Sequence, residues 1–313
     1  MFAGLGVFLI GMQLISHNMQ KLAGNKISAM LVKISDNRLA GIGIGAGAAA
    51  LLESSSATTV ILLGLVNAGI VTLLQATLII MGANIGTTFT MILLSFSYLP
   101  IGEILSFVSL IGAAIIMGAK KDKTRMLGLV IGGLGLIFAG IEIMSGGVDF
   151  LKSSSVFVDI VASVSNPFML VLVGLLASGT IQSGTAVCSV AITLCEAGIM
   201  PTVSAFYIIL GSNIGTCTTA LIAAIGTNAN TKRTALIHLI FNVAGVIIFM
   251  PLIWILEKKF PIATQHVLSP AVIIAYFHII FNVATTIILI PFVKKLVRIS
   301  EILIKDQSST CSY

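Results

Sequence analysis

The polar segment at residues 82–90 occurs twice in this chain. It reads Gly-Ala-Asn-Ile-Gly-Thr-Thr-Phe-Thr, and it returns 129 positions later, at residues 211–219, as Gly-Ser-Asn-Ile-Gly-Thr-Cys-Thr-Thr. Both copies interrupt sequence that is otherwise almost continuously apolar. The recurrence indicates that the chain folds as a duplicated unit in which both polar breaks need polar partners.

The duplication extends well beyond that segment. The same offset, without a gap, pairs Glu53-Ser54-Ser55-Ser56 with Gln182-Ser183-Gly184-Thr185. One register holds from about residue 4 to about residue 94. Internal repeats of this kind are typical of membrane transporters, whose binding sites lie where the repeats meet, near the middle of the bilayer. We therefore expect one central site at the repeat interface.

The scarcity of charge sets the class of protein. Charged residues make up 9% of the 313 residues and hydrophobic residues 57%, whereas about 25% of a soluble domain is charged. The chain is therefore expected to be a polytopic membrane protein. Because the repeats have to bury their polar breaks against each other, we expect a single transmembrane domain over residues 1–313. It comprises repeat 1 at about 4–119, repeat 2 at about 133–256 and an additional C-terminal helix at about 270–293.

Loop charge predicts that the two repeats have opposite orientations. The stretch Ser16–Leu39 carries Lys21, Lys26, Lys33 and Arg38 with one acid, Asp36. Its equivalent, Ser145–Phe168, carries Lys152 with Asp149 and Asp159. Basic loops stay on the cytoplasmic side, so this contrast is expected of an inverted pair. One basic pair, Lys258 and Lys259, falls on the opposite side. The net charge of +6 arises from such loops and predicts no nucleic-acid partner.

Two kinds of apolar segment occur along the chain. Ordinary membrane helices are predicted at residues 105–119, 127–144, 236–256 and 272–293, and a short first helix at Phe2–Ile15. Residues 41–52 and 57–66 are too short to cross, and they flank the polar residues 53–56, which predicts a re-entrant hairpin. Residues 73–99 are long enough, but the glycines at 82–88 predict an unwound break. The expected fold is all-α and polytopic, with two inverted-topology repeats, re-entrant hairpins and discontinuous helices.

Four polar breaks, two in each repeat, would meet at one site. Their candidate ligands are hydroxyls and carboxamides, namely Ser54, Ser55, Ser56, Thr58, Thr59, Gln182, Ser183, Thr185, Asn84, Thr87, Thr88, Asn213, Thr216, Thr218 and Thr219. Such hard oxygen ligands suit an alkali cation, and the N-termini of half-helices suit an anion. None of the four breaks contains Arg, Lys or His. A bound anion would then need co-bound cations to offset its charge, which predicts cation coupling.

These residues resemble a known family. Residues 53–59, Glu-Ser-Ser-Ser-Ala-Thr-Thr, and Gln182-Ser183 are similar to the duplicated Gln-Ser-Ser-Ser signature of the type II sodium/phosphate cotransporters, and residues 82–88 and 211–216 resemble the Gly-x-Asn-Ile-Gly-Thr segments that accompany it. The resemblance implies sodium-driven transport of inorganic phosphate by an elevator-like, inverted-repeat fold. The implied substrate-binding residues are Ser54, Ser55, Ser56, Gln182, Ser183 and Thr185. The sodium ligands assigned with them are Glu53, Asn84, Thr87, Thr88, Asn213, Thr216 and Thr219.

The chain departs from the family pattern at two places in the signature. Glu53 stands where the family has glutamine, and Gly184-Thr185 stands where it has two serines. An ionised Glu53 would repel phosphate and attract cations, whereas a protonated one would mimic glutamine. Burial favours the protonated form. Many bacterial members also carry a PhoU-like helical domain after the membrane part, and we expect that domain to be absent from this chain.

Two further sets of polar residues lie in apolar context. Gln13 and Glu142 occupy equivalent positions, as do Asn67 and Glu196, and we interpret Glu196 as an interfacial residue rather than part of the site. The triplet His238, Phe241 and Asn242 recurs forty residues later as His278, Phe281 and Asn282. Each histidine and asparagine share a helix face, which we interpret as a buried interhelical hydrogen bond rather than a proton relay.

The predicted function is secondary-active, sodium-coupled cotransport of inorganic phosphate in the bacterial plasma membrane. Another small oxyanion or a dicarboxylate would suit the same ligands, and protons could replace sodium. An ion channel would need a continuous polar pore. An enzyme is not expected, because no Ser-His-acid or metal constellation is present. The expected partners are phosphate, sodium and the lipid bilayer, with a homo-oligomer left open. Sodium acts as the coupling ion, and no other cofactor is expected.

Overall fold

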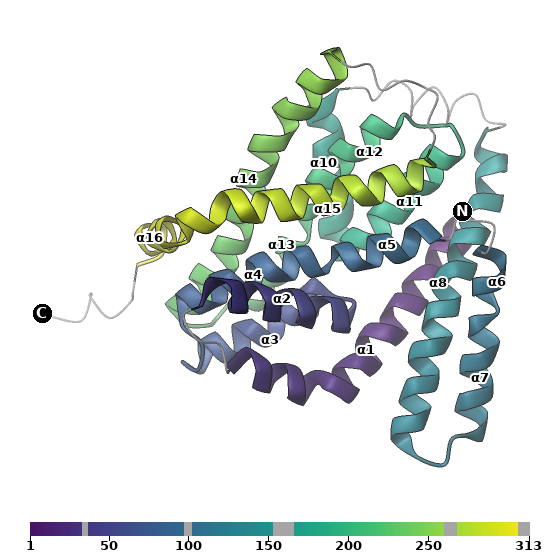
Figure 1. The fold of residues 1–313 in the computed structure, drawn as a ribbon, viewed down its shortest axis with the longest axis horizontal. Helices are drawn as coiled ribbons and strands as arrows, with labels where there is room; N and C mark the ends of the chain where they lie inside the picture. The colour runs from purple at the N-terminus through teal and green to yellow at the C-terminus, as the bar shows by residue number, and fades with distance from the viewer. Residues whose placement is uncertain (33–36, 97–101, 153–165, 260–267, 306–313) are drawn as a thin grey trace, which may run out of the picture.

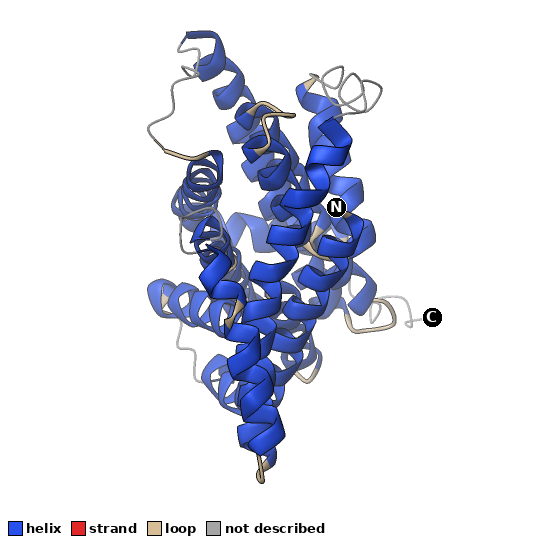
Figure 2. Cartoon of the chain, turned by 90° about the vertical axis from the view of Figure 1, so that its right-hand side faces the viewer, coloured by secondary structure: helices blue, strands red, loops and turns tan. Residues whose placement is uncertain are grey.

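The computed structural model describes residues 1–32, 37–96, 102–152, 166–259 and 268–305. All elements among these residues are helices, and no strand occurs there (Figure 2). Six of the described helical segments are long and apolar enough to cross a membrane. The predicted class, an all-α polytopic membrane protein, is thereby confirmed.

Along the sequence, the helices fall into two halves and a C-terminal addition, and Figure 1 labels them. The first half contains α1 (Phe2–Val32), α2 (Arg38–Leu52), α3 (Ser55–Asn67), α4 (Leu73–Gly86), α5 (Thr88–Phe96), α6 (Gly102–Ser106) and α7 (Val108–Gly118). The second contains α8 (Asp122–Lys152), α10 (Pro167–Ile181), α11 (Gly184–Glu196), α12 (Thr202–Gly215), α13 (Cys217–Ala223) and α14 (Ala229–Lys259). The addition contains α15 (Pro270–Leu289), a 3-10 turn (Ile290–Phe292) and α16 (Val293–Leu303).

The duplicated sequence forms duplicated helices. At the 129-residue offset, α2, α3 and α4 have the same bounds, residue for residue, as α10, α11 and α12. The N-caps match too, since Asn37 and Asn166 each accept hydrogen bonds from the first backbone N–H groups of their helix. With 15 and 13 residues, α2 and α3 fall short of the roughly 20 residues that a span requires. Each pair forms a hairpin that turns back at a polar tip.

Helices α1 and α8 pack against each other through glycines (Figure 1). A Cβ atom on Gly4 would lie 2.6 Å from the carbonyl oxygen of Gly140, and one on Gly11 would lie 2.7 Å from that of Gly133. Gly4 is equivalent to Gly133 and Gly11 to Gly140, so each contact is the counterpart of the other. The two equivalent helices therefore run antiparallel, as an inverted pair requires. The orientation of each half in a membrane stays a prediction.

The glycines of the repeated segment bring helices close together rather than unwinding them. A Cβ atom on Gly82 would clash with the carbonyl oxygen of Ile42 in α2, and one on Gly211 would clash with that of Val171 in α10. The prediction of an unwound stretch over residues 82–88 was therefore wrong in extent. Helix α4 continues to Gly86, and only Thr87, with φ −64° and ψ −20°, separates it from α5. The repeat breaks in the same way at Thr216.

Other predicted boundaries also shift. Helix α1 extends from Phe2 to Val32 rather than ending at Ile15, so Lys21 and Lys26 lie on a helix and not in a loop. Long basic side chains can lay their methylene stems along apolar surface, which allows a membrane helix to continue past its apolar part. The segment predicted at 105–119 is interrupted at Phe107, between α6 and α7. Lys33, Asp36 and Asp159 lie outside the described residues.

The far ends of the two hairpins are tied to the long helices α14 and α15. Asn67 Oδ1 accepts a hydrogen bond from the backbone N–H of Asn228, 3.2 Å away, just before α14. At the equivalent position, Glu196 Oε1 accepts one from the backbone N–H of Ala271, 2.7 Å away, at the start of α15. Figure 1 shows α14 and α15 crossing each other, with α15 in front. Each hairpin is thus held by a hydrogen bond at the end opposite its tip.

Orientation can be tested with two cysteines at equivalent positions. We expect Asn25→Cys, near the end of α1, to react with a membrane-impermeant thiol reagent only from the cytoplasmic side. Ser154→Cys, which lies outside the described residues, should react only from the outside, because the charge contrast inverts the second repeat. The experiment uses a background without native cysteines. Labelling of both cysteines from one side would contradict the inverted arrangement.

Candidate functional site

The hairpin tips share an unusual backbone. Glu53 and Gln182 have φ values of 50° and 57°, and they are the only described residues other than glycine with a positive φ. Each ends one half-helix in the left-handed conformation, which costs about 1 to 3 kcal/mol. The following Ser54 and Ser183 are N-caps of the next half-helix, and their hydroxyls accept from the backbone N–H of Ala57 and Ala186 at 3.1 and 3.2 Å. The repeated dipeptide therefore builds the same sharp turn twice.

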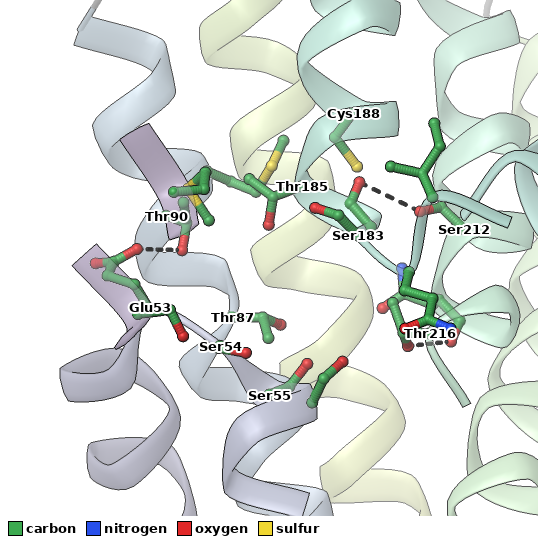
Figure 3. A pocket seen from close by; sticks show the side chains of 18 of the residues that line it. Glu53, Ser54, Ser55, Thr87, Thr90, Ser183, Thr185, Cys188, Ser212 and Thr216 are labelled. Carbon is green, nitrogen blue, oxygen red and sulfur yellow. Dashed lines mark hydrogen bonds between the residues drawn. The ribbon is translucent and has the colours of Figure 1, made fainter. Parts of the chain in front are cut away.

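The turn directs two helix N-termini toward one space. Helices α3 and α11 begin at Ser55 and Gly184, immediately after the tips. The first N–H groups of a helix lack partners within it and carry partial positive charge, so such an end favours an anion. Figure 3 shows Ser54 and Ser55 from one tip across a cavity from Ser183 and Thr185 of the other.

The cavity between the tips has a volume of about 320 Å³. All six predicted substrate-binding residues line it, and so do Glu53, Asn84, Thr87, Asn213 and Thr216 of the predicted sodium ligands. Thr88 and Thr219 are not among its lining residues. The Thr88 hydroxyl donates to the carbonyl of Ile85 at 2.7 Å, within its own helix turn. Thr219 lines a second cavity beside the first.

The two asparagines of the repeated segment make matching hydrogen bonds. Asn84 Nδ2 donates to the carbonyl of Ile80 at 2.9 Å, and Asn213 Nδ2 donates to that of Ile209 at 2.8 Å. With the amide nitrogen held by its own helix, each Oδ1 is the atom left to accept from, or coordinate, a cavity occupant.

Each asparagine also has a threonine partner. The Thr87 hydroxyl donates to the backbone carbonyl of Asn84 at 2.7 Å, and the Thr216 hydroxyl donates to that of Asn213 at 2.8 Å. A hydroxyl retains free lone pairs when it donates. Two equivalent clusters of oxygen atoms therefore face the cavity, one from each half.

The departure from the family pattern at Gly184 has a structural counterpart. A Cβ atom at Gly184 would lie 2.8 Å from the Thr216 side chain and 3.1 Å from the hydroxyl of Ser212. That hydroxyl donates to the Gly184 carbonyl at 3.3 Å (Figure 3). In the first half, the equivalents of Gly184 and Ser212 are Ser55 and Ala83. The first half thus has its hydroxyl on the hairpin tip, at Ser55, and the second half has it on the facing helix, at Ser212.

The halves differ in one hydrogen bond at the tips. The Thr90 hydroxyl donates to Glu53 Oε2 at 2.6 Å (Figure 3). The equivalents are Thr219 and Gln182, yet the Thr219 hydroxyl is buried without a hydrogen-bond partner among the described residues. Both Thr219 and Gln182 line the second cavity, of about 360 Å³. The bond equivalent to Glu53–Thr90 is therefore not made in the second half.

The second cavity extends the first along one side. It shares Gln13 and Ser16 of α1 with the first cavity and continues past Gln20. Val60 of α3 also lines it and is 43% exposed, whereas its equivalent in α11, Ser189, is only 2% exposed. The tips are thus reached through an opening in the half of the molecule that contains Val60.

Several cavity residues were not among the predicted ligands. They are Leu9, Met12, Gln13 and Ser16 of α1, Thr90 and Met91 of α5, Ile181, Cys188, Ser212 and His278. The repeat register contained a signal for Gln13, which is equivalent to Glu142, and for Thr90, which is equivalent to the predicted Thr219. His278 lies on α15, outside the 129-residue register, and the triplet that it shares with His238 gave no signal that it would line the cavity.

The charge inside the cavity is small. Its lining contains no Lys or Arg, one carboxyl group, at Glu53, and one imidazole, at His278. Across the described parts of the chain, no three His, Cys, Asp or Glu side chains come together as a metal site. The arrangement suits an anion held by N–H and O–H groups together with hard cations held by oxygen atoms.

Comparison with known proteins yields one family and several relatives. The family described as Na+/Pi-cotransporter matches residues 7–146 and 153–281. The chain is 30% identical over 245 residues to a Bacillus subtilis (strain 168) protein named "Uncharacterized protein YqeW", and the match covers 78% of each chain. No solved structure matches.

Two other relatives have names that specify phosphate. The chain is 26% identical over 308 residues to the "Putative inorganic phosphate export protein YjbB" of Escherichia coli (strain K12), a match that covers 98% of this chain and 56% of that protein. It is 37% identical over 93 residues to the "Sodium-dependent phosphate transport protein 2A" of Mus musculus, which covers 29% of this chain and 14% of that protein. The chain thus spans just over half of the Escherichia coli relative.

Proposed function

The chain belongs to the Na+/Pi-cotransporter family, and on that premise we propose that it carries inorganic phosphate across the bacterial plasma membrane in symport with sodium. The observation that carries the proposal is the meeting of two half-helix N-termini and two asparagine-threonine clusters at one cavity. The protein is a multi-pass membrane protein of a transporter family.

Phosphate would bind between the two tips. Its oxygen atoms can accept from the free N–H groups at the starts of α3 and α11 and from the hydroxyls of Ser55, Ser56 and Thr185. Two helix ends of opposite direction stabilise one anion without any fixed positive side chain. The absence of Lys and Arg from the lining keeps the site nearly neutral when empty. A dicarboxylate or another oxyanion is the runner-up, since the same donors would serve it.

Sodium would bind at the asparagine-threonine clusters. The Oδ1 atoms of Asn84 and Asn213 and the hydroxyls of Thr87 and Thr216 are hard oxygen ligands. A phosphate that enters a cavity without basic side chains is costly to desolvate unless cations accompany it. Co-binding of sodium offsets that charge, which is the physical basis of coupling.

Alternating access would open the site to one side at a time. The second cavity leads from the tips past Gln20 toward Lys21, on the side that the loop charges assign to the cytoplasm. The unmade Gln182–Thr219 bond lies on this open side, whereas the Glu53–Thr90 bond is formed. We propose that the structure corresponds to an inward-open state. In the outward-open state, Thr219 would bond to Gln182 and Thr90 would release Glu53.

The direction of net flow follows from the gradients. A symporter binds the same ions on either side, so an inward sodium gradient drives phosphate uptake and a reversed gradient drives efflux. The Escherichia coli relative is named as an exporter and the mouse relative as sodium-dependent. Both names are compatible with one symport mechanism under different gradients.

The function is tested by transport in liposomes that contain the purified protein. We expect radiolabelled phosphate to accumulate when an inward sodium gradient is imposed and to exchange with unlabelled phosphate trapped inside. Replacing sodium by potassium should abolish accumulation, and sulfate and succinate should compete poorly. Accumulation under a proton gradient without sodium would instead assign protons as the coupling ion. A protein that exchanges no phosphate under any gradient would contradict the proposal.

The role of Glu53 is tested by restoring the family's glutamine. We expect Glu53→Gln to keep sodium-driven phosphate uptake, because an amide oxygen can also accept the hydrogen bond from Thr90. Uptake by this variant should depend less on pH than uptake by the parent, because the only carboxyl group in the cavity lining is gone. Complete loss of transport would make the carboxylate an obligatory cation ligand or proton carrier. Identical pH profiles and identical sodium dependence in parent and variant would remove Glu53 from the cycle.

A further inference from the structure

His278 brings an imidazole to the cavity from outside both repeats. It lies in the middle of α15, and it lines the cavity together with the hairpin tips although it is only 5% exposed. Helix α15 packs against α5 and α11, which contribute Thr90 and Cys188 to the same lining. The ring therefore stands on a helix that supports both halves of the site.

The ring is left without a protein partner for Nδ1. That atom is buried and has no hydrogen-bond partner among the described residues. Asn282, one turn along α15, donates to the backbone carbonyl of His278 at 2.9 Å rather than to the ring. The interhelical hydrogen bond predicted for this motif is made by Asn242, whose Nδ2 donates to Cys217 Sγ of α13 at 3.1 Å, and not by the ring of His278. Because Nδ1 is enclosed by protein, the ring can meet an occupant of the cavity only through the rest of its edge.

His238 provides an internal comparison. It occupies the same position in the recurring triplet on α14, it is 2% exposed, and its Nδ1 also lacks a partner among the described residues. Asn242 donates to its backbone carbonyl at 3.2 Å, as Asn282 does on α15. His238 does not line the cavity. The two histidines thus share local structure and differ in access to the cavity.

We propose that His278 is a substrate-binding residue whose imidazole donates a hydrogen bond to the transported oxyanion. The inference rests on phosphate as the proposed substrate. A neutral imidazole carries one N–H donor, and no Lys or Arg in the lining competes for that role. Sodium prefers hard oxygen ligands, which the asparagine-threonine clusters supply, so the anion is the occupant that suits the ring. The donor also ties a bound anion to α15, which belongs to neither hairpin.

The test compares the two histidines by substitution. We expect His278→Leu to raise the KM for phosphate about tenfold at saturating sodium, because a donor to a charged oxygen is lost. His238→Leu should keep the parent's KM. His278→Gln keeps an N–H donor and should recover part of the loss. A His278→Leu variant with the parent's KM would overturn the inference. If His278→Leu fails to reach the membrane, the spectroscopic measurement on the parent protein, described next, decides.

A spectroscopic measurement separates contact from indirect effects. In protein labelled with 15N-histidine, the ring signal of His278 is the one that His278→Gln lacks. We expect inorganic phosphate, added with sodium, to shift that signal and to leave the His238 signal in place. A His278 signal that phosphate does not move, in a parent protein that transports phosphate, would contradict the inference alone. A parent that neither transports nor binds phosphate would contradict the proposed function instead.

Discussion

Gln182→Ala lowers phosphate uptake at subsaturating phosphate by tenfold or more, while the protein still reaches the membrane. Gln182 stands at the tip of the second hairpin and lines both cavities. Its replacement removes a hydrogen-bond donor and an acceptor that would contact phosphate bound between the tips, a loss of about 1 to 3 kcal/mol in the bound state. Uptake of radiolabelled phosphate into liposomes, with the amount of inserted protein determined in parallel, measures the effect.

Two companion variants separate the side chain from the backbone. Gln182 has a left-handed conformation, with φ of 57°, which alanine tolerates poorly and glycine adopts freely. Gln182→Gly should therefore lose as much uptake as Gln182→Ala if the amide matters. Gln182→Asn should retain part of the activity, because asparagine tolerates this conformation and keeps an amide. Uptake kinetics like those of the parent in Gln182→Gly would exclude Gln182 from the site.

Val60→Cys reacts with a membrane-impermeant maleimide at least ten times faster than Ser189→Cys does. The two positions are equivalent in the duplicated halves, but Val60 is 43% exposed in the second cavity and Ser189 is 2% exposed. A buried thiol meets the reagent only when the protein opens there. The reagent should act from the cytoplasmic side, and the adduct should reduce uptake at least tenfold because it fills the path to the tips. Mass spectrometry of the labelled protein gives the two rates.

The matched design includes its own controls. Cys188, Cys195, Cys217 and Cys311 are first replaced by alanine or serine, and uptake by this background is the reference. Conditions that favour the opposite state, such as sodium on the outside only, should lower the rate at Val60→Cys and raise it at Ser189→Cys. Equal rates at both positions under all conditions would show that the molecule does not open on one side at a time.

The hairpins were predictable because their signal is local. Short apolar runs on either side of a polar quartet, repeated at one offset, specify two half-helices and a tip, and the structure has these elements at residues 38–67 and 167–196. The serine N-caps follow the same local rule. The six substrate-binding residues predicted from the resemblance all line one cavity. Their roles in binding stay predictions.

Tertiary packing decided the features that the sequence pattern missed. Gly82 and Gly211 have weak helix propensity, yet each lies against the backbone of a neighbouring helix, and that contact keeps the helix intact. His278 reaches the cavity from a helix outside the 129-residue duplication, and the recurring triplet that singled it out did not place it at the cavity. The structure makes the hydrogen bond between Thr90 and Glu53 but not the equivalent bond between Thr219 and Gln182. The sequence contains both pairs of residues, so it has no local signal for which of the two bonds is made.

The antiparallel contact of α1 with α8 has a consequence for how such a protein can arise. Gly4 contacts Gly140 and Gly11 contacts Gly133. These are the contacts that two identical half-length chains would make as a symmetric antiparallel pair. Such chains could pair in this way only if copies inserted into the same membrane in both directions. Fusion of the two copies removes that requirement, and each half is then free to acquire its own loop charges. The difference at the end of α1 fits that divergence, because Lys21 and Lys26 correspond to Phe150 and Ser155 in the second copy.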